Sequence, residues 1–322
     1  MKRASGVLMP VFSLPSKYGI GCFSKEAYKF VDQLKKAGQS YWQILPLGPT
    51  GYGDSPYQSF STYAGNPYFI DLKTLVKEGL LTKKECKEVR CKEQKKIDYE
   101  KIYQNRFKIL KKAYRRFQKN DKYEKFLEEN AFWLEDYCMY MAIKDAHEGK
   151  SWSEWEELLK KREKTALEKV KEELEDEIGF YQFQQYEFDR QWKKLHTYAK
   201  EQGIQIIGDI PIYVAFDSAD AWAAPELFQF DEENNPIRVA GCPPDAFAKT
   251  GQLWGNPLYN WEYHQKTGYA WWIQRIRYCF QHYDVVRIDH FRGFDEYYAI
   301  PYGGEGNRED CSCSRLRLRL TT

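Results

Sequence analysis

The sequence lacks the C-x-x-C spacing of cysteine. Its eight cysteines are scattered along 322 residues, and none of them forms a C-x-x-C pair (Cys22, Cys86, Cys91, Cys138, Cys242, Cys279, Cys311, Cys313). Disulfide-stapled domains and structural zinc sites both need cysteines at short, regular spacing. The pattern argues against both classes and predicts reduced thiols, as are usual in the cytoplasm.

Long apolar runs are also missing. Lys2 and Arg3 would suit the start of a signal peptide, but Pro10 and Pro15 interrupt the apolar stretch that follows. A signal peptide needs a longer unbroken core, and a membrane span needs about 18 apolar residues in succession. The sequence therefore predicts a soluble, cytoplasmic protein with no membrane partner.

An excess of one charge is likewise absent. The chain has 49 basic and 47 acidic side chains, which leaves a net charge of +2. Nucleic acids and anionic membranes attract strongly basic proteins, so this balance argues against both partners.

Aromatic residues, by contrast, make up 17% of the chain, with 25 Tyr and 10 Trp. Some rings belong in the core, whereas rings in surface loops rich in Gly, Pro and Asn suit stacking against sugars.

Residues 1–72 are rich in Gly, Pro and Tyr and predict the first part of an α/β domain. The apolar spacing over 24–38, with a possible cap at its start and a Gly at its end, indicates a helix. The short apolar runs at 41–47 and 67–72 have the length of strands and end in turn residues.

Residues 73–201 are rich in Lys and Glu and predict an inserted helical subdomain. Apolar residues recur at helical spacing over 126–141, and 153–178 is charged almost throughout. A coiled coil is the alternative, but no clean heptad persists.

Residues 202–303 return to the α/β pattern. The run 203–214 predicts a buried strand that ends at Asp209, and 269–283 predicts a helix. Between them, 215–268 predicts a long structured loop, a kind of segment that is usually functional. The opening of Y-D-V-V-R-I-D-H-F-R-G-F (283–294) predicts a second strand, which ends at Asp289.

Two predicted strands thus end in a carboxylate, Asp209 and Asp289. Parallel strands joined by helical crossovers bring their carboxyl ends to one rim, which in a β/α barrel carries the active site. The alternative is that each Asp only caps the turn that follows it. Arg287 and Asp289 are two residues apart and point to the same side of the strand. An Arg there would keep the aspartate ionised, as a nucleophile requires.

Four stretches resemble the 4-α-glucanotransferases (amylomaltases, or disproportionating enzymes), which are relatives of the α-amylases. They are R-I-D-H-F-R-G-F (287–294), W-Q-I-L-P-L-G-P-T-G-Y-G-D-S-P-Y-Q-S-F-S-T-Y-A-G-N-P-Y-F-I-D-L (42–72), G-D-I-P-I-Y-V-A-F-D-S-A-D-A-W (208–222) and G-C-P-P-D-A-F-A-K-T-G-Q-L-W-G-N-P-L-Y (241–259). The resemblance covers roughly 1–303. It implies a (β/α)8 barrel with a helical insertion, 73–201, and a loop-rich insertion, 215–268, over the active site.

The resemblance also implies roles for individual residues. Asp289 would be the nucleophile that forms a covalent glucosyl-enzyme intermediate, and Arg287 would orient it. The residues that would bind substrate are Tyr57 under the glucose at the cleavage site, Asp209 and His290 on that same sugar, and Asp245, Gln252, Trp254 and Asn256 in the stretch that closes over the acceptor side. The implied substrates are maltooligosaccharides and glucans derived from starch or glycogen. No metal or organic cofactor is implied, because carboxylates suffice for the chemistry.

The acid/base glutamate of this family lies beyond the nucleophile, and we expect it to be absent from this chain. Only 33 residues follow Asp289, and 304–322 does not match the family pattern. A frameshift near codon 303 would explain that tail, and it predicts that the downstream DNA encodes the glutamate segment in another frame. We expect about half of the barrel, with strands near residues 44, 69, 207 and 287, and a chain that is poorly stable and inactive alone. The alternatives are an α-glucan hydrolase and a non-catalytic fragment that binds maltooligosaccharide.

Overall fold

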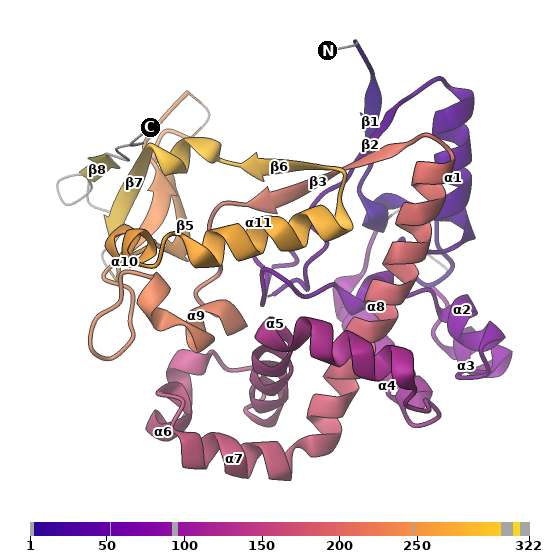
Figure 1. Ribbon diagram of the computed structural model, residues 1–322, viewed down its shortest axis with the longest axis horizontal. Helices are drawn as coiled ribbons and strands as arrows, with labels where there is room; N and C mark the ends of the chain where they lie inside the picture. Colours follow the sequence, from indigo (N-terminus) through magenta and orange to yellow (C-terminus); the bar gives the residue numbers. More distant parts are fainter. Residues whose placement is uncertain (1–2, 52, 92–95, 247, 304–311, 316–322) are drawn as a thin grey trace.

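The computed structural model describes residues 3–51, 53–91, 96–246, 248–303 and 312–315. Four strands form a parallel sheet in the order β1-β2-β3-β6, namely β1 (Gly6–Leu8), β2 (Tyr41–Gln43), β3 (Gln205–Pro211) and β6 (Val285–Asp289). The register sets Asp209 opposite Arg287 and Pro211 opposite Asp289. The carboxyl ends of β3 and β6 therefore meet at one edge, as predicted for part of a β/α barrel (Figure 1).

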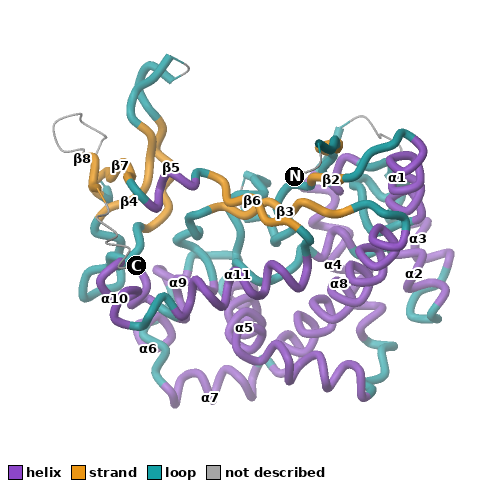
Figure 2. The backbone as a smooth tube through the Cα atoms, turned by 45° about the horizontal axis from the view of Figure 1, so that its top comes forward, coloured by secondary structure: helices purple, strands orange, loops and turns teal. Residues whose placement is uncertain are grey.

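Three helices pack against this sheet. They are α1 (Lys25–Lys36) on β2, α8 (Glu175–Glu201) on β3 and α11 (Ala270–His282) on β6. Ser24 caps α1 by accepting the Glu26 backbone N–H, and the apolar side of α1 is buried. The helices predicted over 24–38 and 269–283 are confirmed. Figure 2 shows α8 and α11 on the same side of β3 and β6.

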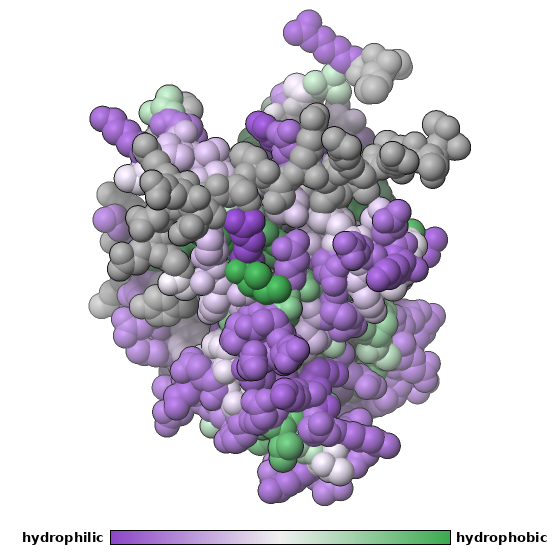
Figure 3. All heavy atoms as spheres, turned by 90° about the vertical axis from the view of Figure 1, so that its left-hand side faces the viewer, coloured by the Kyte–Doolittle hydropathy of each residue, from purple (hydrophilic) through white to green (hydrophobic). Residues whose placement is uncertain are grey.

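The residues described between β2 and β3 contain helices and no strand. Besides α8, these are η2 (Pro67–Phe69), α2 (Leu72–Lys77), α3 (Lys83–Glu88), α4 (Tyr99–Tyr114), α5 (Asp121–Ala146), η3 (Trp152–Glu154), α6 (Glu157–Lys160) and α7 (Lys164–Glu173). The predicted helix over 126–141 lies within α5. No side chain of α7 is fully buried, which agrees with its charged sequence. Hydrophilic residues accordingly dominate the lower part of the face in Figure 3, to which α6 and α7 belong.

A second sheet is antiparallel and has the strand order β5-β4-β7-β8. Its strands are β4 (Arg238–Cys242), β5 (Gln252–Pro257), β7 (Glu296–Pro301) and β8 (Ser312–Arg315). The prediction of one long loop over 215–268 was wrong, because this range holds two of these strands together with α9 (Ala219–Ala223), η4 (Pro225–Leu227) and α10 (Trp261–Lys266). The two strands are poor in β-branched residues, and β4 pairs with β7, which is distant in sequence. Of the tail 304–322, only β8 is described, and the rest lies outside the described residues.

The predicted strand at 67–72 was also wrong. Asn66 accepts the Tyr68 backbone N–H and starts η2, and Asp71 accepts the N–H groups of Lys73 and Thr74 and starts α2. These two caps turn the chain twice within six residues. The segment is apolar because it is buried in the core and not because it pairs in a sheet. A strand that was not predicted, β1, forms the edge of the parallel sheet beside β2. Two more 3-10 turns are η1 (Val11–Ser13), which lies between β1 and α1, and η5 (Phe291–Phe294), which lies between β6 and β7.

The apolar side chains form two cores. One lies between the parallel sheet and its helices and includes Trp42, Phe183 and Trp192. The other is strongly aromatic and joins α5, α9 and α11 to the second sheet through residues such as Tyr140, Trp222 and Tyr259. Many of the abundant rings are thus core residues. Among the residues described, no helix has the length and apolar character to cross a bilayer, and no group of His, Cys, Asp and Glu could hold a metal ion.

Candidate active site

The carboxyl ends of β3 and β6 bring three candidate residues into direct contact. The Nη1 atom of Arg287 donates to both oxygens of Asp209, at 2.7 and 2.6 Å, and its Nη2 atom donates to Asp289 Oδ1 at 2.7 Å. The predicted contact between Arg287 and Asp289 is present. The sequence did not predict that the same guanidinium also binds Asp209. That pairing follows from the register, which sets Arg287 opposite Asp209.

Exposure differs among these three side chains. The Asp209 side chain is fully buried, whereas those of Arg287 and Asp289 are 45% and 39% exposed. The side of β6 that carries Arg287 and Asp289 is therefore partly open to solvent among the described residues. Strand β6 is the last strand of the parallel sheet, so one side of Arg287 is open to solvent.

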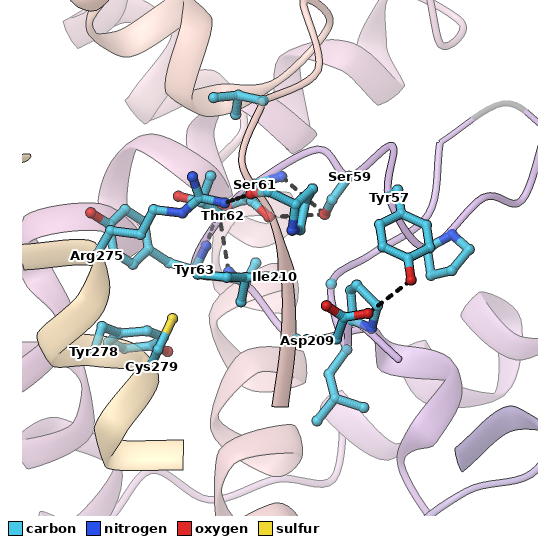
Figure 4. A pocket seen from close by; sticks show the side chains of 18 of the residues that line it. Tyr57, Ser59, Ser61, Thr62, Tyr63, Asp209, Ile210, Arg275, Tyr278 and Cys279 are labelled. Carbon is cyan, nitrogen blue, oxygen red and sulfur yellow. Dashed lines mark hydrogen bonds between the residues drawn. The ribbon is translucent and has the colours of Figure 1, made fainter. Parts of the chain in front are cut away.

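Tyr57 completes the contacts of Asp209. Its hydroxyl donates to Asp209 Oδ2 at 2.8 Å from the segment between β2 and η2 (Figure 4). Burial raises the pKa of Asp209, and the hydrogen bonds from Tyr57 and Arg287 oppose that rise. Burial and the bond to Asp209 together raise the pKa of Tyr57 to about 12, so this hydroxyl keeps its proton at neutral pH. Burial lowers the pKa of Arg287, but the two carboxylates outweigh this and raise it above its ordinary value.

A pocket opens beside Tyr57 and Asp209. Its walls come from the segment 46–65, the end of β3 and helix α11. Figure 4 shows Tyr57 and Asp209 at one end of this pocket and Arg275, Tyr278 and Cys279 at the other. Burial raises the pKa of the Cys279 thiol to about 11, so Cys279 is not a reactive thiolate.

His290 and Trp254 lie against each other next to Asp289. Their ring centroids are 4.9 Å apart and their planes are nearly perpendicular. His290 directly follows β6 in the left-handed conformation, with φ of +53°, and this turn directs the chain away from the strand. Burial lowers the pKa of His290, although the Asp289 carboxylate opposes the effect, so its imidazole is neutral at pH 7. Tyr213, which the sequence analysis missed, lies 6.1 Å from His290 and 6.3 Å from Trp254 between ring centroids.

The other predicted substrate-binding residues have different surroundings. Gln252 is exposed on β5 and accepts the Trp254 indole N–H at 2.9 Å. Asp245 lies on the turn between β4 and β5, where it accepts the Ala248 N–H, and Figure 2 shows this ribbon projecting away from the helices. Asn256 is only 5% exposed. Both ends of its amide are already bonded within the protein, to Val214 and to Gln58.

Comparisons with known proteins identify the family of this chain. The family described as 4-alpha-glucanotransferase matches residues 9–315, so the match extends past residue 303, where the resemblance was expected to end. The 4-alpha-glucanotransferase of Clostridium butyricum is 50% identical over 299 residues, which are 92% of this chain and 61% of that protein. The corresponding protein of Aquifex aeolicus is 49% identical over 94% of this chain and 62% of its own length.

A solved structure gives the same result. The amylomaltase from Streptococcus agalactiae in complex with acarbose matches with a TM-score of 0.94 and 43% identity, over 98% of this chain and 65% of that chain. This chain thus spans about three fifths of the length of the curated relatives. The chain belongs to the 4-α-glucanotransferase family.

Proposed function

We propose that the protein transfers α-1,4-glucan segments from one maltooligosaccharide to another, through a covalent glucosyl intermediate on Asp289. The observation that carries this proposal is the guanidinium of Arg287, which joins Asp289 to Asp209 at the ends of two parallel strands. Such a site orients one carboxylate to attack a sugar carbon and holds a second carboxylate beside it. Membership of the family supports the choice of reaction.

Asp289 would act as the nucleophile through Oδ2. Its Oδ1 atom accepts from Arg287, whereas Oδ2 accepts no hydrogen bond from the described residues. A carboxylate oxygen is the atom that attacks the sugar carbon, and the guanidinium of Arg287 holds the other oxygen of this group by a hydrogen bond. The bond to Arg287 also fixes which oxygen faces the substrate.

Asp209 and Tyr57 would bind the sugar at the cleavage site. Asp209 Oδ2 accepts from both Tyr57 and Arg287, but Oδ1 accepts only from Arg287 among the described residues and has a lone pair left for a sugar hydroxyl. The ring of Tyr57 suits stacking under that sugar. Neutral His290 would contact the same sugar. On the acceptor side, the ring of Trp254 would contact the next sugar, with Gln252 and Asp245 at its edge.

The reaction needs a second carboxyl group, about 5–5.5 Å from the nucleophile, as the acid/base. Asp209 does not suit this role, because both of its oxygens already accept hydrogen bonds within the protein, from Arg287 and Tyr57. We propose that the acid/base comes from the part of the relatives' length that this chain does not span. The chain alone would then bind maltooligosaccharide without turnover, which is the second candidate function.

The test compares this chain with a chimaera that adds the remaining segment of a relative such as the amylomaltase of Streptococcus agalactiae. Both are incubated with maltotriose, and acarbose binding is measured by calorimetry. We expect acarbose binding by both proteins, and products longer than maltotriose only from the chimaera. Products that are only shorter than maltotriose would indicate a hydrolase. Full activity in an Asp289→Asn chimaera would refute the assignment of the nucleophile.

A further inference from the structure

Gln58 connects the segment that carries Tyr57 to the strand that carries Trp254. Its Nε2 atom donates to Asn256 Oδ1 at 3.1 Å and to the Trp254 carbonyl oxygen at 3.4 Å. A side-chain amide has two N–H groups, and Gln58 directs both of them to β5. This half-buried side chain therefore holds two separate segments of the site together.

Asn256 attaches this connection to the parallel sheet. Its Nδ2 atom donates to the Val214 carbonyl oxygen at 2.7 Å, and Val214 follows β3. Both ends of the Asn256 amide are thus occupied, and the residue is buried. Asn256 is placed to hold β5 in position.

The contacts of the site form a closed path when Gln58 is included. Each member touches the next through a hydrogen bond or a ring contact, or is its neighbour in sequence. In order, the members are Tyr57, Asp209, Arg287, Asp289, His290, Trp254 and Gln58. The path closes because Gln58 is the neighbour of Tyr57 in sequence. A change in the position of Trp254 is therefore constrained from two sides.

We propose that Gln58 is a positioning residue that sets the spacing between the rings of Tyr57 and Trp254, and thereby between the sugars on the two sides of the bond that is cut. This inference rests on the proposed function and deepens it. Gln58 need not touch the substrate, because it acts through the carbonyl of Trp254 and the amide of Asn256. A transferase requires an acceptor sugar to be held in place before water attacks the intermediate. The spacing of the two rings would decide that competition.

The first experiment measures the position of Trp254 without any sugar. The chain is labelled with 5-fluorotryptophan, and the Trp254→Phe variant identifies the 19F resonance of Trp254. We expect Gln58→Leu to shift or broaden this resonance, because two acceptors lose their donor. Gln104→Leu is the matched control, since Gln104 is an exposed amide on α4 and should leave the resonance unchanged. An unchanged resonance in Gln58→Leu would overturn the proposal.

A second variant separates loss of the donor from loss of the fold. Gln58→Glu keeps the shape of the side chain, but an ionised carboxylate has no proton to donate. The two acceptors beside it would raise the pKa of the new carboxyl group above its ordinary value of about 4.3. We expect the 19F resonance to return toward its original position as the pH falls and the carboxyl regains a donor. A resonance that does not respond to pH would contradict the role of the hydrogen bonds.

Acarbose binding then tests whether the position of Trp254 affects the affinity for a ligand. We expect Gln58→Leu to weaken acarbose binding about tenfold, since a hydrogen bond is lost and its acceptors are left unpaired, while Gln104→Leu binds as the unmodified chain does. A shifted resonance with unchanged affinity would refute coupling between the rings. Failure of the unmodified chain to bind acarbose would instead refute the proposed function, and the 19F result would still show whether Gln58 positions Trp254.

Discussion

The Asp284 carboxylate accepts a hydrogen bond from the backbone N–H of Ile206, with 2.8 Å between N and Oδ2. Asp284 directly precedes β6 and Ile206 lies on β3, so one side chain fixes the register of the two strands that carry the candidate catalytic residues. His196 and Lys200, one turn apart on α8, hold the same carboxylate at 2.9 and 3.0 Å. Helix α8 therefore aligns β3 with β6.

We expect the stabilising effect of Asp284 to depend on pH. Burial raises the pKa of Asp284, but the hydrogen bonds from Ile206 and His196 outweigh burial and leave the pKa below its ordinary value. A carboxyl group whose pKa is depressed in the folded state stabilises the fold above its unfolded pKa of about 3.9, and this stabilisation is lost as the pH falls through the folded pKa. The difference in free energy of unfolding between the unmodified chain and Asp284→Asn should be largest near pH 7 and shrink below about pH 4.

Urea denaturation at pH 7, 5, 4 and 3 measures this difference. Glu26→Gln is the control, because Glu26 pairs with Lys29 near the surface and such pairs contribute little. The variant at Glu26 should differ little from the unmodified chain at every pH. A pH-independent effect of Asp284→Asn would show that the loss is one of packing and not of charge.

Local signals in the sequence were enough to predict several elements. Helix α1 has a serine cap and an apolar side at helical spacing, and both features act within a dozen residues. The apolar runs at β3 and β6 predicted buried strands; both strands are present, but only β3 is buried, and no residue of β6 is. The run at 67–72 misled because its length and composition suit a strand, although Asn66 and Asp71 are caps that predict two turns. The second sheet was missed because β4 pairs with β7, a partner that no local pattern reveals.

The sequence was enough to name candidate residues for the site, but it did not predict most of the contacts between them. The contact of Arg287 with Asp289 follows from their spacing on one strand. The contact of Arg287 with Asp209 depends on the register of two strands that are far apart in sequence. Gln58 lies next to Tyr57 in a quoted motif, but its partners on β5 are visible only in the folded chain. Amide side chains carry no charge pattern, so a sequence gives little warning of such a link.

We expect Tyr57→Phe to shift the pH dependence of acarbose binding. The variant keeps the ring but removes the hydroxyl that donates to Asp209. Because this hydrogen bond opposes the effect of burial, its loss raises the pKa of Asp209 further above its ordinary value. Binding that needs an ionised Asp209 is lost as the pH falls through that pKa, so the loss should begin at a higher pH in the variant.

Calorimetric titration with acarbose between pH 4 and pH 8 tests this. Tyr103→Phe provides the control, since Tyr103 is 59% exposed on α4 and lies outside the pocket. Superimposable pH profiles for Tyr57→Phe and the unmodified chain would refute the role of the hydroxyl.

We expect Arg287→Lys to separate the two carboxylates. The guanidinium uses Nη1 for Asp209 and Nη2 for Asp289, whereas an ammonium group has one nitrogen and cannot reproduce this fork. Since Arg287 lowers the pKa of Asp209, the variant should raise it, and carbon NMR of labelled aspartate carboxyl groups would follow the titration.

In the chimaera, turnover of maltotriose should fall at least a hundredfold in Arg287→Lys if orientation of the nucleophile matters as proposed. Arg292→Lys, which alters an exposed pair with Glu296, should retain turnover. Equal turnover in the two variants would show that the fork is dispensable.

We expect Gly65→Ala to destabilise the chain by about 1–3 kcal/mol through overpacking. A methyl group at this position would collide with the ring of Phe188 on α8. Gly65 is also held by Gln185, which accepts its N–H at 2.7 Å and donates to its carbonyl at 2.9 Å, so the backbone has little room to move away. Urea denaturation measures the loss, and Gly51→Ala is the comparison, because a methyl group on Gly51 would come no nearer than 3.4 Å to the surrounding atoms. The double variant with Phe188→Ala tests the cause. If its loss of free energy of unfolding is smaller than the sum of the losses in the two single variants, the collision with α8 is the cause. Strict additivity would show that the glycine is needed for another reason, and that α8 does not hold the segment leading from Tyr57.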